Sequence, residues 1–260
     1  MNTSLERVAS KVPAITFGFW IIKILATALG ETVDSVLMTS FGETTASSER
    51  FGVGGYLVGA VLFGVPLVVL VWAQIWVRRF HPWLYWATIV TSATCGMTLA
   101  DFADRSLELG FQLGSLILFA CVLFSLFVWL GTKGYISVSS VADPKVVILY
   151  WTTATFCQSL GTALGDWIAG AGPGYSGGAL VFGLGLAVLA VLYFVSKLSH
   201  VALFWAAFIL SRPLSEAVGD FLDRPLSQGG LDFSRPTTAV ILAVVVFGLI
   251  LILPQRPSRP

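Results

Sequence analysis

The sequence contains few charged residues. Only 11% of its 260 residues are Asp, Glu, Lys or Arg, whereas soluble domains contain roughly 25%. So few charges cannot cover the surface of a soluble globule. The formal net charge is +1, which argues against the basic patch or stripe of a nucleic-acid-binding protein.

Cysteine and histidine are also scarce. Three Cys and two His are too few for a disulfide scaffold or for a zinc module built from Cys and His. The sequence lacks a phosphate-binding loop and a nucleophile–base constellation, so we expect neither an enzyme nor an organic cofactor. The abundant component is apolar, at 56% of all residues, and this composition indicates a membrane protein.

Eight stretches are long enough to cross a bilayer, which needs about 20 mostly apolar residues. Four are almost purely apolar: 56–76, 111–130, 179–195 and 238–253. The other four carry charged residues and alternate with the first set: 14–39, 83–104, 146–169 and 201–222. We therefore predict an all-α polytopic membrane protein with eight transmembrane helices and a single transmembrane domain, residues 1–260.

The distribution of Lys and Arg predicts the orientation. With both termini in the cytoplasm, nine of the 15 basic residues lie in inner loops and tails and four in outer loops. This arrangement obeys the positive-inside rule. We expect a multi-pass membrane protein with both termini in the cytoplasm.

The four charged spans are copies of one motif. They align without a gap as FWIIKILATALGETVDSVLMTS from Phe19, YWATIVTSATCGMTLADFADRS from Tyr85, YWTTATFCQSLGTALGDWIAGA from Tyr150 and FWAAFILSRPLSEAVGDFLDRP from Phe204. The second position is always tryptophan, and a glycine stands at one position in three of the copies. We expect structural roles for these residues, which are Trp20, Trp86, Trp151, Trp205, Gly30, Gly96 and Gly161.

Each copy pairs a motif helix with a plain apolar helix, which gives four repeats of approximately 13–79, 80–143, 144–198 and 199–255. A two-helix unit returns the chain to the same side, so the copies are parallel. We predict a pseudo-fourfold arrangement, or nested twofold axes, in which the first, third, fifth and seventh helices line a polar core. The glycines would let these helices approach closely; alternatively, they would mark helix breaks at a substrate site.

The repeated Trp and the opening segment KVPAITFGFWIIKILATALGET resemble a known family. It is an uncharacterised bacterial family of membrane-anchored proteins built from four tandem repeats, each with two transmembrane segments and a characteristic Trp. The resemblance covers essentially the whole chain, and it implies a multi-pass protein of the bacterial inner membrane. It implies no activity, so the functional expectations rest on the residues themselves.

Acidic residues concentrate in the outer halves of the motif helices. Ionisable side chains within membrane spans are costly, and they face a bundle interior or a wet cavity. Carboxylate and hydroxyl oxygens are hard ligands for divalent cations, and a thioether among them would favour a softer ion such as Mn²⁺. The predicted cation-binding residues are Glu31, Asp34, Met97, Asp101, Thr162, Asp166, Glu216 and Asp220.

Basic and amide side chains accompany these acids. We expect roles in charge pairing or gating for Lys23, Arg212, Gln158, Arg105 and Arg224. Arg224 follows Asp220 by four residues and should form a local pair at the rim, whereas Arg212 should pair with Glu216 or Glu31. In the alternative interpretation, the acids only neutralise these bases and fix the helix register.

The sequence favours a secondary transporter that moves a divalent metal cation, most simply an Mn²⁺-like ion, outward in exchange for protons. The metal ion would be its substrate. An organic-cation transporter or channel and a non-transport membrane scaffold or sensor remain as alternatives. The expected partners are the lipid bilayer, a small cation and protons, with no nucleic acid, and the chain would be a monomer or a homodimer.

Overall fold

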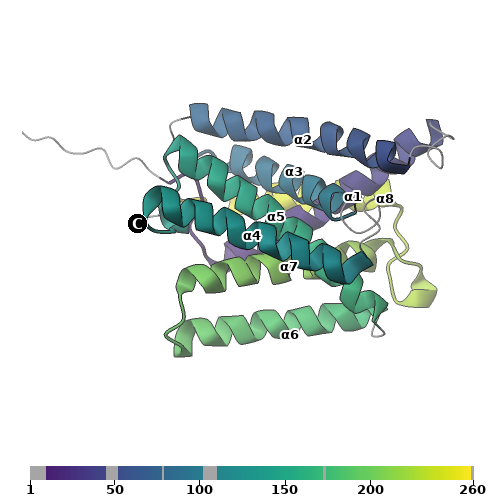
Figure 1. The fold of residues 1–260 in the computed structure, drawn as a ribbon. Helices are drawn as coiled ribbons and strands as arrows, with labels where there is room; N and C mark the ends of the chain where they lie inside the picture. The colour runs from purple at the N-terminus through teal and green to yellow at the C-terminus, as the bar shows by residue number, and fades with distance from the viewer. Residues whose placement is uncertain (1–9, 45–51, 78, 102–109, 172–173, 259–260) are drawn as a thin grey trace, which may run out of the picture.

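The computed structural model describes residues 10–44, 52–77, 79–101, 110–171 and 174–258. These residues form eight α-helices, with two short 3₁₀ turns between them. The helices are α1 (Phe17–Thr44), α2 (Gly52–Trp76), α3 (Pro82–Asp101), α4 (Gly110–Lys133), α5 (Pro144–Gly170), α6 (Gly174–Val195), α7 (His200–Asp223) and α8 (Arg235–Ile252). They run alongside one another in one bundle (Figure 1). The predicted all-helical fold is confirmed.

Four helices among the described residues are long and apolar enough to cross a membrane. They are α4, α6 from Gly177 onward, α7 and α8. α2 contributes a shorter apolar stretch, Val61–Trp76. This is the character of a membrane protein, although the criterion is met by four helices rather than by the predicted eight.

The motif helices α1, α3, α5 and α7 form a closed ring. α1 packs against α3, α3 against α5, α5 against α7, and α7 returns to α1. The ring closes within a single chain, because the first and last motif helices are neighbours. Its interior is therefore formed by side chains from all four motif helices.

The plain helices, which we call cover helices, surround this ring. α2 packs mainly on α3, α4 on α5, α6 on α7, and α8 on α1. Figure 1 shows α2 and α6 at opposite margins of the bundle, with motif helices between them. Each cover helix thus packs mainly on the motif helix that follows it in the chain, and α8 closes the circuit on the first motif helix.

The outward faces of the cover helices are apolar. Large exposed side chains occur on each of them, including Val68, Trp72, Leu116, Phe127, Leu180, Phe194, Val240 and Phe247. An apolar surface of this extent would be unfavourable in water, because soluble monomers rarely expose large contiguous apolar patches. The polar residues of the motif helices lie inside, so the protein has the inverted polarity expected of a chain in lipid.

The first and last described segments of the chain meet at one end of the bundle. The amide of Ala14 donates to the carbonyl of Arg256 at 2.8 Å, and the amide of Ser258 donates to the carbonyl of Val12 at 2.9 Å. The ammonium group of Lys11 donates to the carbonyl of Gln74 at 2.6 Å, in the last turn of α2. A basic side chain at a helix C-terminus satisfies carbonyls that have no partner within the helix.

The loop before α5 is fixed by Asp143 at the same end. Its carboxylate accepts a hydrogen bond from the backbone amide of Lys145 at 2.8 Å and caps the helix. The ammonium group of Lys133 lies 2.9 Å from the same carboxylate. The hydrogen bond from Lys133 holds the pKa of Asp143 below its ordinary value.

Candidate functional site

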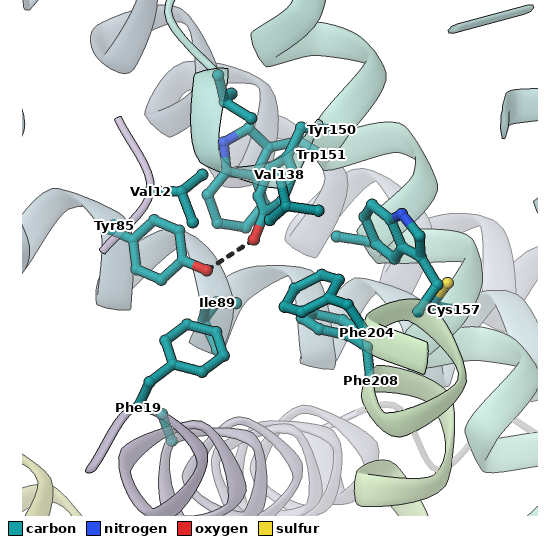
Figure 2. Close-up of a cluster of buried hydrophobic side chains, with 14 of the residues drawn as sticks. Val12, Phe19, Tyr85, Ile89, Val138, Tyr150, Trp151, Cys157, Phe204 and Phe208 are labelled. Carbon is teal, nitrogen blue, oxygen red and sulfur yellow. Dashed lines mark hydrogen bonds between the residues drawn. The ribbon is translucent and has the colours of Figure 1, made fainter. Parts of the chain in front are cut away.

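An aromatic layer closes the ring at the end where the motif helices begin. Its members are the first aromatic residue of each repeat: Phe19, Tyr85, Tyr150 and Phe204. The ring centroids of Phe19 and Tyr85 are 6.4 Å apart, those of Tyr85 and Tyr150 6.5 Å, and those of Phe204 and Phe19 6.3 Å. Figure 2 shows these side chains converging from different helices. They leave the axis densely packed with apolar groups at this level.

The hydroxyl groups of Tyr85 and Tyr150 form a hydrogen bond with each other. Their hydroxyl oxygens are 2.7 Å apart, and the dashed line in Figure 2 marks this bond. Tyr85 is 1% exposed and Tyr150 is completely buried. A buried hydroxyl without a partner would be costly, so this single bond allows two polar groups to lie in an apolar layer.

The tryptophans pack beside this layer. Trp86, Trp151 and Trp205 are buried, whereas Trp20 is partly exposed. The indole N–H of Trp86 donates to the side-chain oxygen of Gln255 at 3.0 Å, and that of Trp151 donates to Gln74 at 2.9 Å. These bonds tie α3 to the C-terminal tail and α5 to α2. Trp86 and Trp151 thus connect the ring to the segments around it, whereas the buried indole N–H of Trp205 has no hydrogen-bond partner among the described residues.

The glycine column lies where successive motif helices approach most closely. A Cβ atom on Gly30 would come 2.6 Å from the carbonyl oxygen of Val90. On Gly96 it would come 2.7 Å from Cβ of Gln158, and on Gly161 it would come 2.5 Å from Cβ of Arg212. Only glycine permits these approaches between α1 and α3, α3 and α5, and α5 and α7. The three helices remain continuous at these glycines.

A polar layer lies two helical turns beyond the aromatic layer. Its members occupy the eighth position after the first aromatic of each repeat: Thr27, Ala93, Gln158 and Arg212. All four are completely buried. Within the part of the chain that the structure describes, no hydrogen-bond partner exists for the Thr27 hydroxyl, for either amide atom of Gln158, or for Nε and Nη2 of Arg212. Most buried polar groups in proteins are paired, so this layer is exceptional.

Arg212 forms an ion pair between two neighbouring helices of the ring. Its Nη1 lies 2.5 Å from Oε2 of Glu31, joining α7 to α1. The arginine side chain is completely buried and the glutamate side chain is 15% exposed. Of the two partners that the sequence predicts for Arg212, the structure selects Glu31. A buried ion pair of this kind is strongly destabilising to break, because either charge alone is poorly solvated.

Lys23 forms no ion pair with any carboxylate of the described residues, which corrects the charge-pairing role predicted for it. Its ammonium group donates to the hydroxyl of Ser211 at 2.5 Å and to the carbonyl of Phe208 at 3.0 Å. It also lies 4.4 Å from the centroid of the Phe208 ring, within the range of a cation–π interaction. These contacts satisfy a fully buried ammonium group without a counter-charge.

The predicted acidic residues are distributed over all four motif helices beyond the polar layer. Asp34 is buried, and its Oδ1 has no hydrogen-bond partner among the described residues. The charges of Asp101, Arg212 and Glu31 all act on it. Glu216 interacts electrostatically with Glu31, Arg212, Asp166 and Asp220. Its carboxylate lies against Gly165 of α5. The ring thus brings Glu31, Asp34, Asp101, Asp166, Glu216 and Asp220 within electrostatic range of one another.

The remaining predicted residues lie around this group. Arg224 and Asp220 form the local i,i+4 pair, with Nη2 and Oδ2 2.5 Å apart. The hydroxyl of Thr162 donates to the carbonyl of Gln158 in its own helix at 3.2 Å. Met97 is partly buried. Arg105 lies outside the described residues.

No preformed metal site is present in the described residues, since no group of three His, Cys, Asp or Glu side chains there could hold a metal ion. Glu31 and Asp220 are instead paired with Arg212 and Arg224.

Sequence reasoning missed two residues that matter here. Ser211 holds Lys23, and Gln74 links three helices by accepting from Trp151 and donating to Thr88 at 2.7 Å. A signal for Ser211 exists in the alignment, because small residues occupy its column in every repeat: Ala26, Ser92, Cys157 and Ser211. Gln74 had a weaker signal, as an isolated amide in an otherwise apolar span.

The model of one known protein family matches this chain. The model of a family described as Repeat of Unknown Function (DUF347) matches the chain three times, at residues 84–135, 149–199 and 203–254. These segments contain most of α3 with α4, most of α5 with α6, and most of α7 with α8, and together they cover more than half of the chain. No curated protein and no solved structure matches the sequence. The chain therefore belongs to the Repeat of Unknown Function (DUF347) family.

Proposed function

We propose that this protein is a proton-coupled transporter of a small divalent cation, most simply an Mn²⁺-like ion. In this proposal all eight helices span the inner membrane of a bacterium, with both termini in the cytoplasm. The four repeats are related by a pseudo-fourfold axis along the membrane normal. The motif helices form the translocation core, and the cover helices face lipid.

The ion pair between Arg212 and Glu31 is the observation that carries this proposal. It is buried inside the ring of four motif helices, and the cover helices around that ring have apolar outward faces. Charged groups in such a position are costly and mark ion or proton pathways in membrane proteins. A bundle that needed only stable packing would be served as well by apolar side chains of similar volume.

The same pair suggests how the cation is controlled. Without a substrate, Arg212 neutralises Glu31 and holds α7 against α1. An entering divalent cation competes with Arg212 for the Glu31 carboxylate and recruits Asp34 or Glu216 as further oxygen ligands. Carboxylates of low solvation also take up protons readily, so protonation of the same group releases the ion and couples cation movement to proton movement.

Transport by the full chain in proteoliposomes tests the proposal. Vesicles are loaded with a metal-sensitive dye and a pH-sensitive dye, and Mn²⁺, Mg²⁺ and Ca²⁺ are added in turn. We expect Mn²⁺ flux accompanied by opposite proton movement, and we expect Glu31→Gln and Asp166→Asn to abolish both. Asp143→Asn is the matched control, because Asn also caps helices and residue 143 lies outside the core.

Each other outcome of this assay contradicts the proposal. Movement of a quaternary ammonium ion without metal flux assigns the core to organic cations. An absence of flux for every cation, in a protein that melts cooperatively, assigns the chain to a scaffold or sensor. If Glu31→Gln leaves the metal flux unchanged, the core carboxylates are not part of the transport pathway.

A further inference from the structure

One edge of the Arg212 guanidinium in the polar layer has no hydrogen-bond partner among the described residues. Nη1 of this side chain contacts Glu31, while Nε and Nη2 have no partner among the described residues. The N–H groups of Nε and Nη2 point in parallel from one side of the planar guanidinium. Their spacing matches the two oxygens of a carboxylate or another oxoanion, which arginine binds bidentately.

Gln158 lies in the same layer on α5, the helix against which Arg212 packs. Cβ of Arg212 packs against Gly161, which lies one helical turn after Gln158 on α5. Gln158 is completely buried, and neither its amide nitrogen nor its amide oxygen has a partner in the described chain. Burying a polar amide without a hydrogen bond is unfavourable, so packing alone does not account for a glutamine at residue 158.

Thr27 approaches the same place from α1. It lies one turn after Lys23, which contacts Ser211, and one turn before Glu31, which contacts Arg212. Residues four apart share a helix face, so Thr27 faces α7 between these two contacts. Its buried hydroxyl also lacks a partner in the part of the chain that the structure describes.

The unpartnered groups of this layer suit an anion better than a cation. Arg212 is completely buried, and among the described residues Glu31 is the one carboxylate that contacts it directly. The unpartnered groups are mostly N–H donors, which a metal cation cannot use and an oxoanion can.

We propose that Arg212, Gln158 and Thr27 form a binding site for a carboxylate or similar small oxoanion. The site lies closer to the aromatic layer than the acidic residues do, and it shares Arg212 with the cation pathway proposed above. A cation and an anion bound at adjacent levels would neutralise each other's charge inside the membrane. The anion could come from a small organic acid or from an inorganic oxoanion.

Thermal melting of the purified full chain in detergent tests this site. Measurements are made with a chelator present, so that the result does not depend on metal transport. Sodium formate replaces sodium chloride at constant ionic strength. We expect a saturable rise in the melting temperature of the wild-type protein, because a ligand that binds only the folded state stabilises it.

Two variants of nearly unchanged shape locate the site. Gln158→Leu and Thr27→Val should each raise the half-saturating formate concentration at least about tenfold, because each removes one hydrogen bond to a charged ligand. Gln74→Leu is the matched control, since it removes another buried amide that is fully hydrogen-bonded elsewhere. Its formate response should equal that of the wild type.

The outcomes separate the possibilities. Stronger binding of propionate than of nitrate identifies an organic acid as the source, and the reverse order identifies an inorganic oxoanion. If formate has no effect beyond that of chloride, the unpartnered groups serve only internal water and the proposal is overturned. An equal formate response in the wild type, Gln158→Leu and Thr27→Val overturns it as well, because the anion then binds elsewhere.

Discussion

The aromatic layer and the polar layer occupy aligned positions of the same four helices, yet they differ in how their polar groups are satisfied. They are eight residues apart, or about 12 Å along the helix axis. In the aromatic layer the hydroxyls of Tyr85 and Tyr150 bond to each other. In the polar layer, Gln158 and two nitrogens of Arg212 have no partner among the described residues. One layer is complete without a ligand, whereas the other is equipped to bind one.

The largest expected effect on stability comes from breaking the ion pair between Arg212 and Glu31. Glu31→Gln leaves the buried Arg212 charge without its carboxylate and should lower the free energy of unfolding by about 3–5 kcal/mol. The double variant Glu31→Gln/Arg212→Met should recover most of this loss. Chemical denaturation in detergent measures both variants. A single variant as stable as the wild type would show that the ion pair is not needed to hold α1 against α7.

The glycine column, which lies just beyond the polar layer, gives the next largest effect. Gly161→Ala places a methyl group 2.5 Å from Cβ of Arg212, and such overpacking should cost about 1–3 kcal/mol. Gly183→Ala on α6 is the control, because nothing lies within 4 Å of the added atom. It should be neutral or stabilising by up to about 1 kcal/mol, since alanine is the better helix former. Equal melting temperatures for the two variants would contradict the close approach of α5 and α7.

The aromatic layer should respond to loss of its one hydrogen bond. Tyr85→Phe leaves the buried hydroxyl of Tyr150 without a partner and should cost roughly 1–2 kcal/mol. Tyr85→Phe/Tyr150→Phe removes both hydroxyls and should be nearly as stable as the wild type. Unfolding free energies of the two variants provide the test. A double variant that is less stable than the single one would show that the hydroxyls have further partners.

The smallest expected effect distinguishes two buried glutamines. In buffer without an oxoanion, Gln158→Leu should change the free energy of unfolding by less than about 1 kcal/mol, because no hydrogen bond is lost. Gln74→Leu should cost about 1–3 kcal/mol, since it leaves Trp151 and Thr88 without a partner. The melting temperatures of the two variants test this difference in stability. A large loss at Gln158 would mean that its amide is satisfied in the folded protein.

The repeat alignment predicted which residues share a level of the ring, because aligned positions on parallel helices lie at equal heights. It also marked the glycine column, where Gly30, Gly96 and Gly161 lie against the next helix. The alignment does not encode the order of helices around the ring. For that reason the sequence could not choose between Glu31 and Glu216 as the partner of Arg212.

Other features depend on the tertiary arrangement alone. The packing of each cover helix on the following motif helix is invisible in the sequence, since an apolar helix presents a similar surface to any neighbour. The partners of Lys23 are a serine and a backbone carbonyl, and charge counting cannot find such uncharged acceptors. The missing partners of Gln158 likewise follow only from its surroundings.

The most direct test of the account compares the two layers in one transport assay. Glu31→Gln and Tyr85→Phe/Tyr150→Phe are reconstituted side by side with the wild type, and Mn²⁺ flux and proton movement are recorded. The account predicts that the Glu31 variant loses both fluxes while the double tyrosine variant keeps them. Full Mn²⁺ flux in Glu31→Gln, or no flux in the wild type, would contradict it.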